Sequence, residues 1–390
     1  MSRFFDLVSK PAREMGVSLP PTFPKRPIAD AQPRLIQLDS NENPFGPSPR
    51  AIEAMQAALA SANYYPDDDC AELRGKLAAH HNLQPEQVTV TAGSTGMLSL
   101  LCQTMLGPGR NAVTSERSFI VYSMAVRATG ARLIETPMRE DGFDLDAILN
   151  AINEDTRLVL LANPNNPTGT MIEVAAVDQF VAAVPAQVVV VLDEAYYEFA
   201  AHIAAQRKVE YSRSLNYVRL NQLRQGASVV VLRTFSKAHG LAGLRIGYGL
   251  GPAELLAYCA RMRDTFSVSS IAQAAAIAAL DDLDHIERTV SNNAEQAQVL
   301  SVGLSALGYR VVPTAANFLC CDVGAEAAGV AERLRSLGVS VRPLGGWGAP
   351  TCIRVSIGTP EQNAVFLDAM RRISATRPPR ADGDNGSATG

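Results

Sequence analysis

Strand-like runs alternate with helical stretches over the first two thirds of the chain. The clearest runs are four or five residues long and rich in β-branched residues, and they cover residues 88–92, 158–161, 188–191 and 228–232. Such runs are typical of strands that are buried on both faces of a sheet. Because strands that alternate with helices pair in parallel, the pattern up to about Ala260 predicts an α/β fold with a mainly parallel sheet.

The pattern changes from about Ser270. An alanine-rich stretch predicts a helix over residues 271–283, and a second helix follows that ends near Leu307. Short strands are expected after it, at residues 309–312, 318–322, 339–342 and 353–356. This order of elements predicts a second, smaller α+β domain at the C-terminal end.

We therefore predict four segments along the chain. Residues 1–34, rich in proline and basic residues, form an N-terminal arm that drapes over a partner subunit. Residues 35–265 form the large domain, with segment 35–50 packing near the small domain, which covers residues 266–374. The tail, residues 375–390, has no apolar period and is expected to be disordered.

Composition and charge exclude several functions. The chain has 390 residues, enough for two packed lobes, and its net charge of −4 gives no electrostatic footprint for nucleic acid or an anionic membrane. We expect no membrane span and no signal peptide. The six cysteines lack CxxC spacing, which indicates reduced thiols in a cytoplasmic protein, and the five histidines form no metal-ligand pattern.

The most informative motif surrounds Lys237. It follows the strand-like run 228–232 and carries two hydroxyls, Thr234 and Ser236, beside the lysine and Arg245 eight residues after it. This set suits a lysine that holds an aldehyde cofactor as a Schiff base, while the hydroxyls and the guanidinium bind a phosphate on that cofactor. Pyridoxal phosphate (PLP) is the cofactor that has both groups.

Two further motifs fit the same cofactor. Asp193 follows the run 188–191 in the sequence LDEAYYEF, at the carboxyl end of the expected strand. Its carboxylate could pair with the ring nitrogen and keep it protonated, and Tyr196 could donate a hydrogen bond to the ring's phenolic oxygen. Asn166, in the turn NPNNPTG, precedes a proline that restricts its backbone, so its amide can point at the same oxygen.

A small-residue turn is expected between the strand at 88–92 and a helix over residues 97–105. Its sequence, Gly93-Ser-Thr-Gly96, would present free backbone amides at the start of the helix. Such amides bind phosphate well, so this turn is a candidate for the cofactor's phosphate.

Taken together, these motifs resemble the fold-type-I PLP-dependent aminotransferases of class I/II, and within them most closely the histidinol-phosphate aminotransferase branch. The resemblance extends from about Leu35 to Ile373. The matching motifs are NPFGPSP (43–49), YPD (65–67), NPNNPTG, DEAYYEF, SKAHGLAGLRIGYG and IRVSIGT.

The resemblance implies roles for further residues around the cofactor. Phe119 corresponds to the aromatic ring that stacks on the cofactor, and Ser94 and Thr95 correspond to the phosphate-binding amides. Tyr65 matches a tyrosine that reaches the phosphate of the partner subunit, which implies a homodimer with shared sites, although Tyr64 next to it could take this role instead.

The substrate contacts also come from the resemblance. Arg354 matches an arginine that binds the substrate's anionic group, and Arg342 matches a second arginine that binds a substrate phosphate. A guanidinium suits either anion because it can bind two oxygens at once. Asn43 lies where the N-terminal segment of the family closes over the substrate.

The implied reaction is a ping-pong transamination with Lys237 as the proton carrier. The leading substrates are L-histidinol phosphate and 2-oxoglutarate, as in histidine biosynthesis. Two alternatives share most of these motifs, an aromatic or broad-specificity amino-acid aminotransferase and a threonine-phosphate decarboxylase-like lyase. The sequence does not separate the three.

Overall fold

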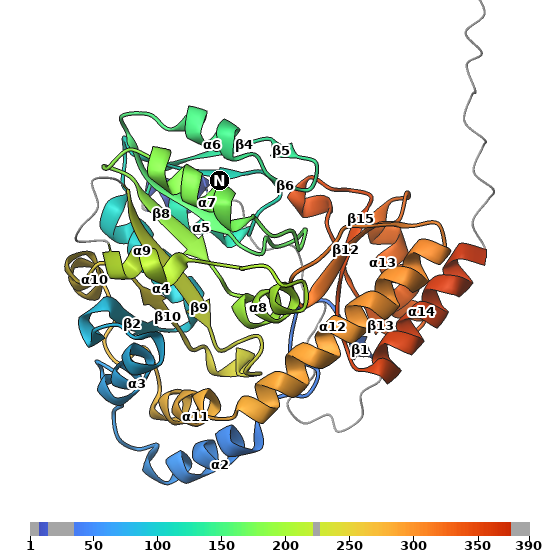
Figure 1. Ribbon diagram of the computed structural model, residues 1–390, viewed down its shortest axis with the longest axis horizontal. Helices are drawn as coiled ribbons and strands as arrows, with labels where there is room; N and C mark the ends of the chain where they lie inside the picture. The colour runs from blue at the N-terminus through green and yellow to red at the C-terminus, as the bar shows by residue number, and fades with distance from the viewer. Residues whose placement is uncertain (1–7, 15–34, 221–226, 376–390) are drawn as a thin grey trace, which may run out of the picture.

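The computed structural model describes residues 8–14, 35–220 and 227–375. These residues form two packed units (Figure 1). The first is a large sheet with helices on both faces, and the second is a smaller sheet covered by three helices at the C-terminal end of the chain. The predicted fold class, a mainly parallel α/β domain with a smaller α+β domain, is confirmed.

The large sheet has seven strands in the order β2-β10-β9-β8-β7-β3-β4. Its strands pair in parallel except for β10, which runs antiparallel to both of its neighbours. The bounds are β2 Val88–Thr91, β3 Asn111–Ser115, β4 Arg132–Thr136, β7 Thr156–Ala162, β8 Val189–Asp193, β9 Ser228–Thr234 and β10 Gly247–Leu250. The four predicted runs are therefore strands of one sheet.

Successive residues of the central strands face opposite layers of helices. On β8, Val190 and Leu192 pack into one core, and Val189 and Val191 pack into the other. The first core includes residues of α3 (Ala71–His81), α6 (Leu145–Ala151), α7 (Val174–Ala183), α9 (Ser214–Leu220) and α11 (Ser270–Leu280). The second includes residues of α4 (Gly93–Met105), α5 (Val121–Ala128) and α10 (Ala253–Ala260). Burial on both faces is why these runs are apolar throughout.

The smaller unit is built on an antiparallel sheet in the order β11-β12-β15-β14. Its strands are β11 Arg310–Val311, β12 Phe318–Asp322, β14 Arg342–Pro343 and β15 Cys352–Ser356, and its helices are α12 Leu283–Ala306, α13 Ala327–Ser336 and α14 Pro360–Ala375. A short parallel pair joins β1 (Ile36–Gln37) to β13 (Val339–Ser340). The segment that begins at residue 35 is thereby attached to the C-terminal unit.

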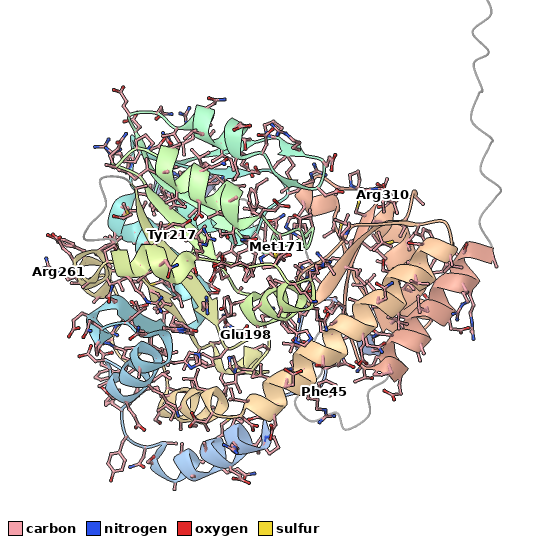
Figure 2. The ribbon with its side chains drawn as sticks, viewed as in Figure 1. Phe45, Met171, Glu198, Tyr217, Arg261 and Arg310 are labelled. Atoms are coloured by element: carbon pink, nitrogen blue, oxygen red, sulfur yellow. The ribbon has the colours of Figure 1, made fainter. Side chains whose placement is uncertain are left out.

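Several contacts connect the two units. The helix α8 (Tyr197–Gln206) packs against α12, and Phe199 shares a small core with Phe318. Near the hairpin of β5 (Met138–Arg139) and β6 (Gly142–Phe143), Arg310 forms an ion pair of 2.6 Å with Asp141; Figure 2 labels this arginine at the edge of the smaller unit.

The packing of α11 bears on the boundary between the units. Its alanines lie in the core of the large sheet, whereas Leu300 and Leu304 of α12 lie in the core of the smaller unit. We propose that the boundary lies at the start of α12, after α11, and not at residue 266. The helix α2 (Pro49–Ala58) covers α11, and its N-cap is Ser48, whose side chain accepts a hydrogen bond from the amide of Ala51.

The predicted tail lies, except for residue 375, outside the described residues, as does most of the predicted arm. Of the arm, the structure describes residues 8–14, including the short helix α1 (Lys10–Glu14). Among the described helices, none is long and apolar enough to cross a membrane.

Candidate active site

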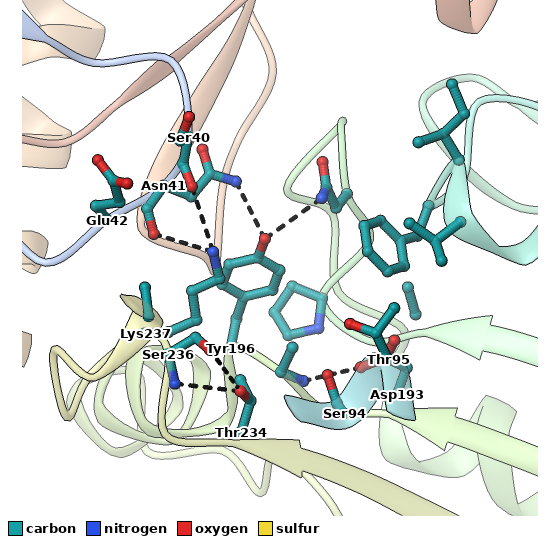
Figure 3. Close-up of a pocket in the computed structure, with 18 of the residues that line it drawn as sticks. Ser40, Asn41, Glu42, Ser94, Thr95, Asp193, Tyr196, Thr234, Ser236 and Lys237 are labelled. Atoms are coloured by element: carbon teal, nitrogen blue, oxygen red, sulfur yellow. Dashed lines mark hydrogen bonds between the residues drawn. The ribbon is translucent and has the colours of Figure 1, made fainter. Parts of the chain in front are cut away.

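A cavity of about 440 Å³ opens where β7, β8 and β9 end, beside the smaller unit (Figure 3). All but two of the predicted site residues line it. The predicted residues that line the cavity are Ser94, Thr95, Phe119, Asn166, Asp193, Tyr196, Thr234, Ser236, Lys237, Arg245, Arg342 and Arg354. The carboxyl ends of neighbouring parallel strands meet at one edge of a sheet, which explains why motifs far apart in the sequence share one cavity.

One end of the cavity is built to hold an anion. The helix α4 begins at Gly93, so the predicted turn 93–96 is in fact the first turn of the helix, and the prediction of a helix start at Met97 was wrong. The positive φ of Gly93, +77°, turns the chain directly from β2 into the helix. Amides in a first helical turn have no intrahelical acceptor and carry the positive end of the helix dipole.

Close packing at this end requires two glycines. A Cβ on Gly247 would lie 2.5 Å from the amide nitrogen of Ser94, and a Cβ on Gly93 would lie 2.5 Å from Nη2 of Arg245. The glycines therefore let β10 and Arg245 approach the helix start. The Thr234 hydroxyl donates to Oγ of Ser236 at 3.0 Å, and Nη1 of Arg245 lies 3.4 Å from the same oxygen.

Asp193 is buried beside the cavity at the end of β8. Its carboxylate accepts from the Tyr122 hydroxyl at 3.1 Å and from the Ala195 amide at 3.2 Å, and no described cation forms an ion pair with it. Burial raises the pKa of this carboxyl from its ordinary 3.8 to about 6. A cationic group in the cavity would stabilise the carboxylate, because it would supply the missing charge.

A chain of hydrogen bonds crosses the cavity between the two units. Nη1 of Arg354 donates to Oδ1 of Asn166 at 2.6 Å, and Nδ2 of Asn166 lies 3.4 Å from the Tyr196 hydroxyl. Nδ2 of Asn41 donates to the same hydroxyl at 3.1 Å. Tyr196 therefore lies at the junction of the large sheet, the smaller unit and the N-terminal segment, residues 35–50.

Lys237 follows β9 and reaches toward the N-terminal segment. Its Nζ lies 3.1 Å from the carbonyl oxygen of Asn41 and 3.4 Å from that of Ser40, as Figure 3 shows. It also lies 5.6 Å from the ring centroid of Tyr196. The amine therefore lies near the tyrosine ring, in the wall of the cavity.

Two arginines form the cationic wall of the cavity. Arg342 on β14 and Arg354 on β15 are directly paired in register, and both are buried. Their protein partners are neutral, since both donate to the carbonyl oxygen of Asp39. No described carboxylate forms an ion pair with either, and Nε of Arg354 is buried without a partner. Burial lowers the pKa of Arg354 to about 10, and the charge of Arg342 adds to the lowering.

Two predicted residues do not line the cavity. Asn43 points away from it and donates to the carbonyl oxygen of Ala238 at 2.8 Å and to Thr289, so in this chain it holds the N-terminal segment against the segment after Lys237. Tyr65 lies on the surface with 81% of its side chain exposed and stacks on Phe266 at a centroid distance of 4.6 Å.

Comparison with known proteins agrees with this geometry. Residues 33–370 match the family described as aminotransferase class I and II. The chain belongs to this family. It is 42% identical to histidinol-phosphate aminotransferase 2 of Pseudomonas aeruginosa over 94% of this chain and 93% of that protein. It is 40% identical to histidinol-phosphate aminotransferase of Moorella thermoacetica over 93% of both proteins.

A solved structure supports the same assignment. Histidinol-phosphate aminotransferase from Sinorhizobium meliloti, in complex with pyridoxal-5'-phosphate, superimposes with a TM-score of 0.79 at 30% identity, covering 87% of this chain and 91% of that one. The predicted family, class I/II aminotransferase of the histidinol-phosphate branch, is therefore confirmed.

The groups that line the cavity fit pyridoxal phosphate in their chemistry. The anion-binding end suits the phosphate, the buried carboxylate of Asp193 suits the ring nitrogen, and the Tyr196 hydroxyl suits the ring oxygen. The amine of Lys237 lies among these groups, where the aldehyde would stand. Phe119 lines the same cavity, where its ring can stack on the cofactor, and it packs edge-on against Tyr122 at 5.6 Å.

Sequence reasoning missed several residues of the site. Ser40, Asn41, Glu42 and Trp347 line the cavity, and Tyr122 supports Asp193 from behind. Asn41 and Glu42 belong to the same turn as Asn43, and of these three residues Asn41 and Glu42 line the cavity. Nothing in the local sequence distinguishes Tyr122 from an ordinary core tyrosine.

The raised pKa of Asp193 predicts a pH effect in the aminotransferase without cofactor. Because the folded-state pKa exceeds the ordinary value, the stabilising contribution is full below pH 3.8 and is lost as the pH rises through about 6. The parent should therefore lose about 1.4 kcal/mol of stability relative to Asp193→Asn between pH 5 and pH 8.

Denaturant unfolding of the cofactor-free proteins at both pH values measures this difference. Asp368→Asn, on the exposed side of α14, serves as the control and should respond to pH as the parent does. Identical pH responses of the parent and Asp193→Asn would contradict the account.

Proposed function

We propose that this aminotransferase uses pyridoxal phosphate to transfer the amino group of L-histidinol phosphate to 2-oxoglutarate, giving imidazole-acetol phosphate and L-glutamate. The observation that carries the proposal is the pair Arg342 and Arg354, two buried cations without a carboxylate partner in the cavity. A dianionic phosphate on the substrate offsets both charges. Several relatives at about 40% identity bear the name histidinol-phosphate aminotransferase.

The cofactor is held by groups at the ends of four strands, β2, β7, β8 and β9, and by Arg245, which precedes β10. The amides of Ser94 and Thr95, the hydroxyls of Thr234 and Ser236, and the guanidinium of Arg245 bind its phosphate. Asp193 keeps the ring nitrogen protonated, and Asn166 and Tyr196 bind the ring oxygen. Pyridoxal phosphate supplies the electron sink that stabilises negative charge at the substrate's Cα.

Lys237 is the catalytic residue of this proposal. Its amine anchors the cofactor's aldehyde and, once the substrate amine has replaced it, carries the proton between the substrate's Cα and the cofactor's C4′ carbon. The carbonyl oxygens of Ser40 and Asn41 lie within reach of this amine and hold it beside the reacting atoms.

We also propose that the protein is a homodimer in which Tyr65 reaches the phosphate of the partner's cofactor. The support is the exposure of this region: Tyr64 is 71% exposed, Tyr65 81% and Phe266 44%, and the two aromatic rings of Tyr65 and Phe266 stack on each other at the surface. A large exposed aromatic patch is typical of a protein interface. A cytoplasmic location stays a prediction.

The half-reaction tests the cofactor, the chemistry and the substrate together. We expect the purified protein with pyridoxal phosphate to show a visible absorbance band that bleaches on addition of L-histidinol phosphate without a keto acid. Lys237→Ala should retain the cofactor and fail to convert it.

Other outcomes of this experiment point elsewhere. Bleaching with phenylalanine but not with histidinol phosphate would indicate an aromatic aminotransferase. Release of carbon dioxide from phosphothreonine would indicate the lyase. Absence of a band after cofactor is added would contradict the proposal as a whole.

The charge of Arg342 should discriminate between substrates. Loss of a charge-assisted hydrogen bond costs roughly 1.5–3 kcal/mol, so Arg342→Gln should raise KM for histidinol phosphate about 10- to 100-fold. The KM for unphosphorylated L-histidinol should change little. Steady-state kinetics with both donors measures the effect, with Arg371→Gln on the exposed face of α14 as the control. Equal losses for both donors would show that Arg342 does not bind the phosphate.

The proposal that Tyr65 of one subunit binds the cofactor of the other is tested with single variants and with mixed dimers. Tyr65→Phe should weaken binding of pyridoxal phosphate about tenfold, since it removes one hydrogen bond to a charged group, and Tyr64→Phe should leave it unchanged. At a cofactor concentration that leaves Tyr65→Phe largely unloaded, mixing Tyr65→Phe subunits with inactive Lys237→Ala subunits should raise the activity, because one site of each mixed dimer has both the tyrosine and the lysine. A loss in Tyr64→Phe instead would move the assignment by one residue, and failure to complement would argue against shared sites.

A further inference from the structure

Asn41 occupies an unusual position between the two units. It is 1% exposed, its φ of 56° lies in the left-handed region, and it precedes Glu42 in the wall of the cavity. A non-glycine residue in this region is uncommon, and asparagine is among the few that tolerate it. The surrounding hydrogen bonds hold it there.

Ser356 of the smaller unit fixes the orientation of the Asn41 amide. The backbone amide of Asn41 donates to Oγ of Ser356 at 2.7 Å, and that hydroxyl donates to Oδ1 of Asn41 at 3.2 Å. Because Oδ1 is occupied by this donor, the NH₂ group must face the other way. There it donates to the Tyr196 hydroxyl oxygen at 3.1 Å.

The second asparagine at Tyr196 is fixed in the same manner. Oδ1 of Asn166 accepts from Arg354, so its NH₂ group faces the tyrosine at 3.4 Å. A phenol oxygen has two acceptor sites and one hydrogen to donate. With an amide donor approaching from each of Asn41 and Asn166, the hydroxyl hydrogen of Tyr196 is left to point elsewhere, and among the described residues no acceptor receives it. The open direction is the cavity that Tyr196 lines.

The backbone of Asn41 acts on a second catalytic group. Its carbonyl oxygen accepts from Nζ of Lys237 at 3.1 Å and from Nδ2 of Asn317, also at 3.1 Å. Asn317 belongs to the smaller unit, so this carbonyl is held in place from that side. One residue thus connects the smaller unit to both the tyrosine and the lysine, as Figure 3 shows for the contacts within the cavity.

We infer that Asn41 is a positioning residue: its amide directs the Tyr196 hydroxyl hydrogen at the cofactor's ring oxygen, and its carbonyl oxygen holds the Lys237 amine. The inference rests on the proposed function, since it requires pyridoxal phosphate in the cavity. A hydrogen-bond donor at the ring oxygen stabilises the deprotonated form of the bound cofactor's chromophore and so lowers the pKa of this chromophore, which its visible absorbance band reports. Loss of the donor that points at the ring oxygen raises this pKa.

Two substitutions separate the amide from the backbone. Asn41→Gly removes the amide, and glycine adopts a positive φ without strain, so the carbonyl oxygen stays in place. Asn41→Asp keeps the shape, but its carboxylate accepts the tyrosine hydrogen and draws it away from the cofactor. Absorbance titration of the cofactor-loaded proteins should show that the pKa of the chromophore increases by about one unit in Asn41→Gly, which is a tenfold decrease in its proton dissociation constant. The increase in pKa should be larger in Asn41→Asp.

Two controls exclude a merely structural effect. Asn82→Gly makes the same change at another asparagine with positive φ, which is exposed at the end of α3, and should leave the band unchanged. In a Tyr196→Phe background, Asn41→Gly should cause no further shift, because the amide acts through the tyrosine hydroxyl.

The outcomes are distinct. If the parent shows the band and its pKa is the same in Asn41→Gly and Asn41→Asp, the inference fails while the proposed function stands. The same holds if the shift caused by Asn41→Gly persists in the Tyr196→Phe background. If the parent shows no band, the proposed function fails and the inference fails with it.

Discussion

A buried carboxylate without a cationic partner is the constraint around which this structure is arranged. Asp193 ends the central strand β8, where the sheet is covered on both faces, and among the described residues its carboxylate accepts hydrogen bonds from one phenol and one backbone amide. Burying an unpaired charge is unfavourable, so the site is built for a cation that enters with a ligand. The anion-binding start of α4, the lysine and the tyrosine line the same cavity as this carboxylate.

The second constraint is that the site has two halves. The large sheet supplies Asp193, Lys237 and the start of α4, and the smaller unit supplies Arg342 and Arg354. The two halves are joined by hydrogen bonds from Arg354 to Asn166 and from Asn166 and Asn41 to Tyr196, so a change at Arg354 can alter the position of the Tyr196 hydroxyl. The attachment of β1 to β13 also makes the N-terminal segment part of the smaller unit, and it brings two carbonyl oxygens to Lys237.

The sequence predicted those site residues whose position follows from a strand end. Asp193 and Lys237 lie within a few residues of the ends of apolar runs, and parallel pairing brings such ends together, so the local pattern was enough. Asn41 could not be found in this way, because its partners Tyr196 and Ser356 lie 155 and 315 residues away and no local pattern encodes those contacts. The helix start at Gly93 was misplaced because small residues resemble a turn, whereas the positive φ of one glycine lets the helix begin at once. The proposed role of Tyr65 involves a second chain, so no contact within this chain encodes it.

The protonation state of the cofactor's ring nitrogen tests the central claim most directly. Pyridoxal phosphate labelled with ¹⁵N in the ring, bound to the parent protein and to Asp193→Asn, gives this state by NMR. The account predicts a protonated, pyridinium-type nitrogen in the parent and a neutral one in the variant. A neutral nitrogen in the parent, with Asp193 intact, would contradict the claim that this carboxylate organises the site.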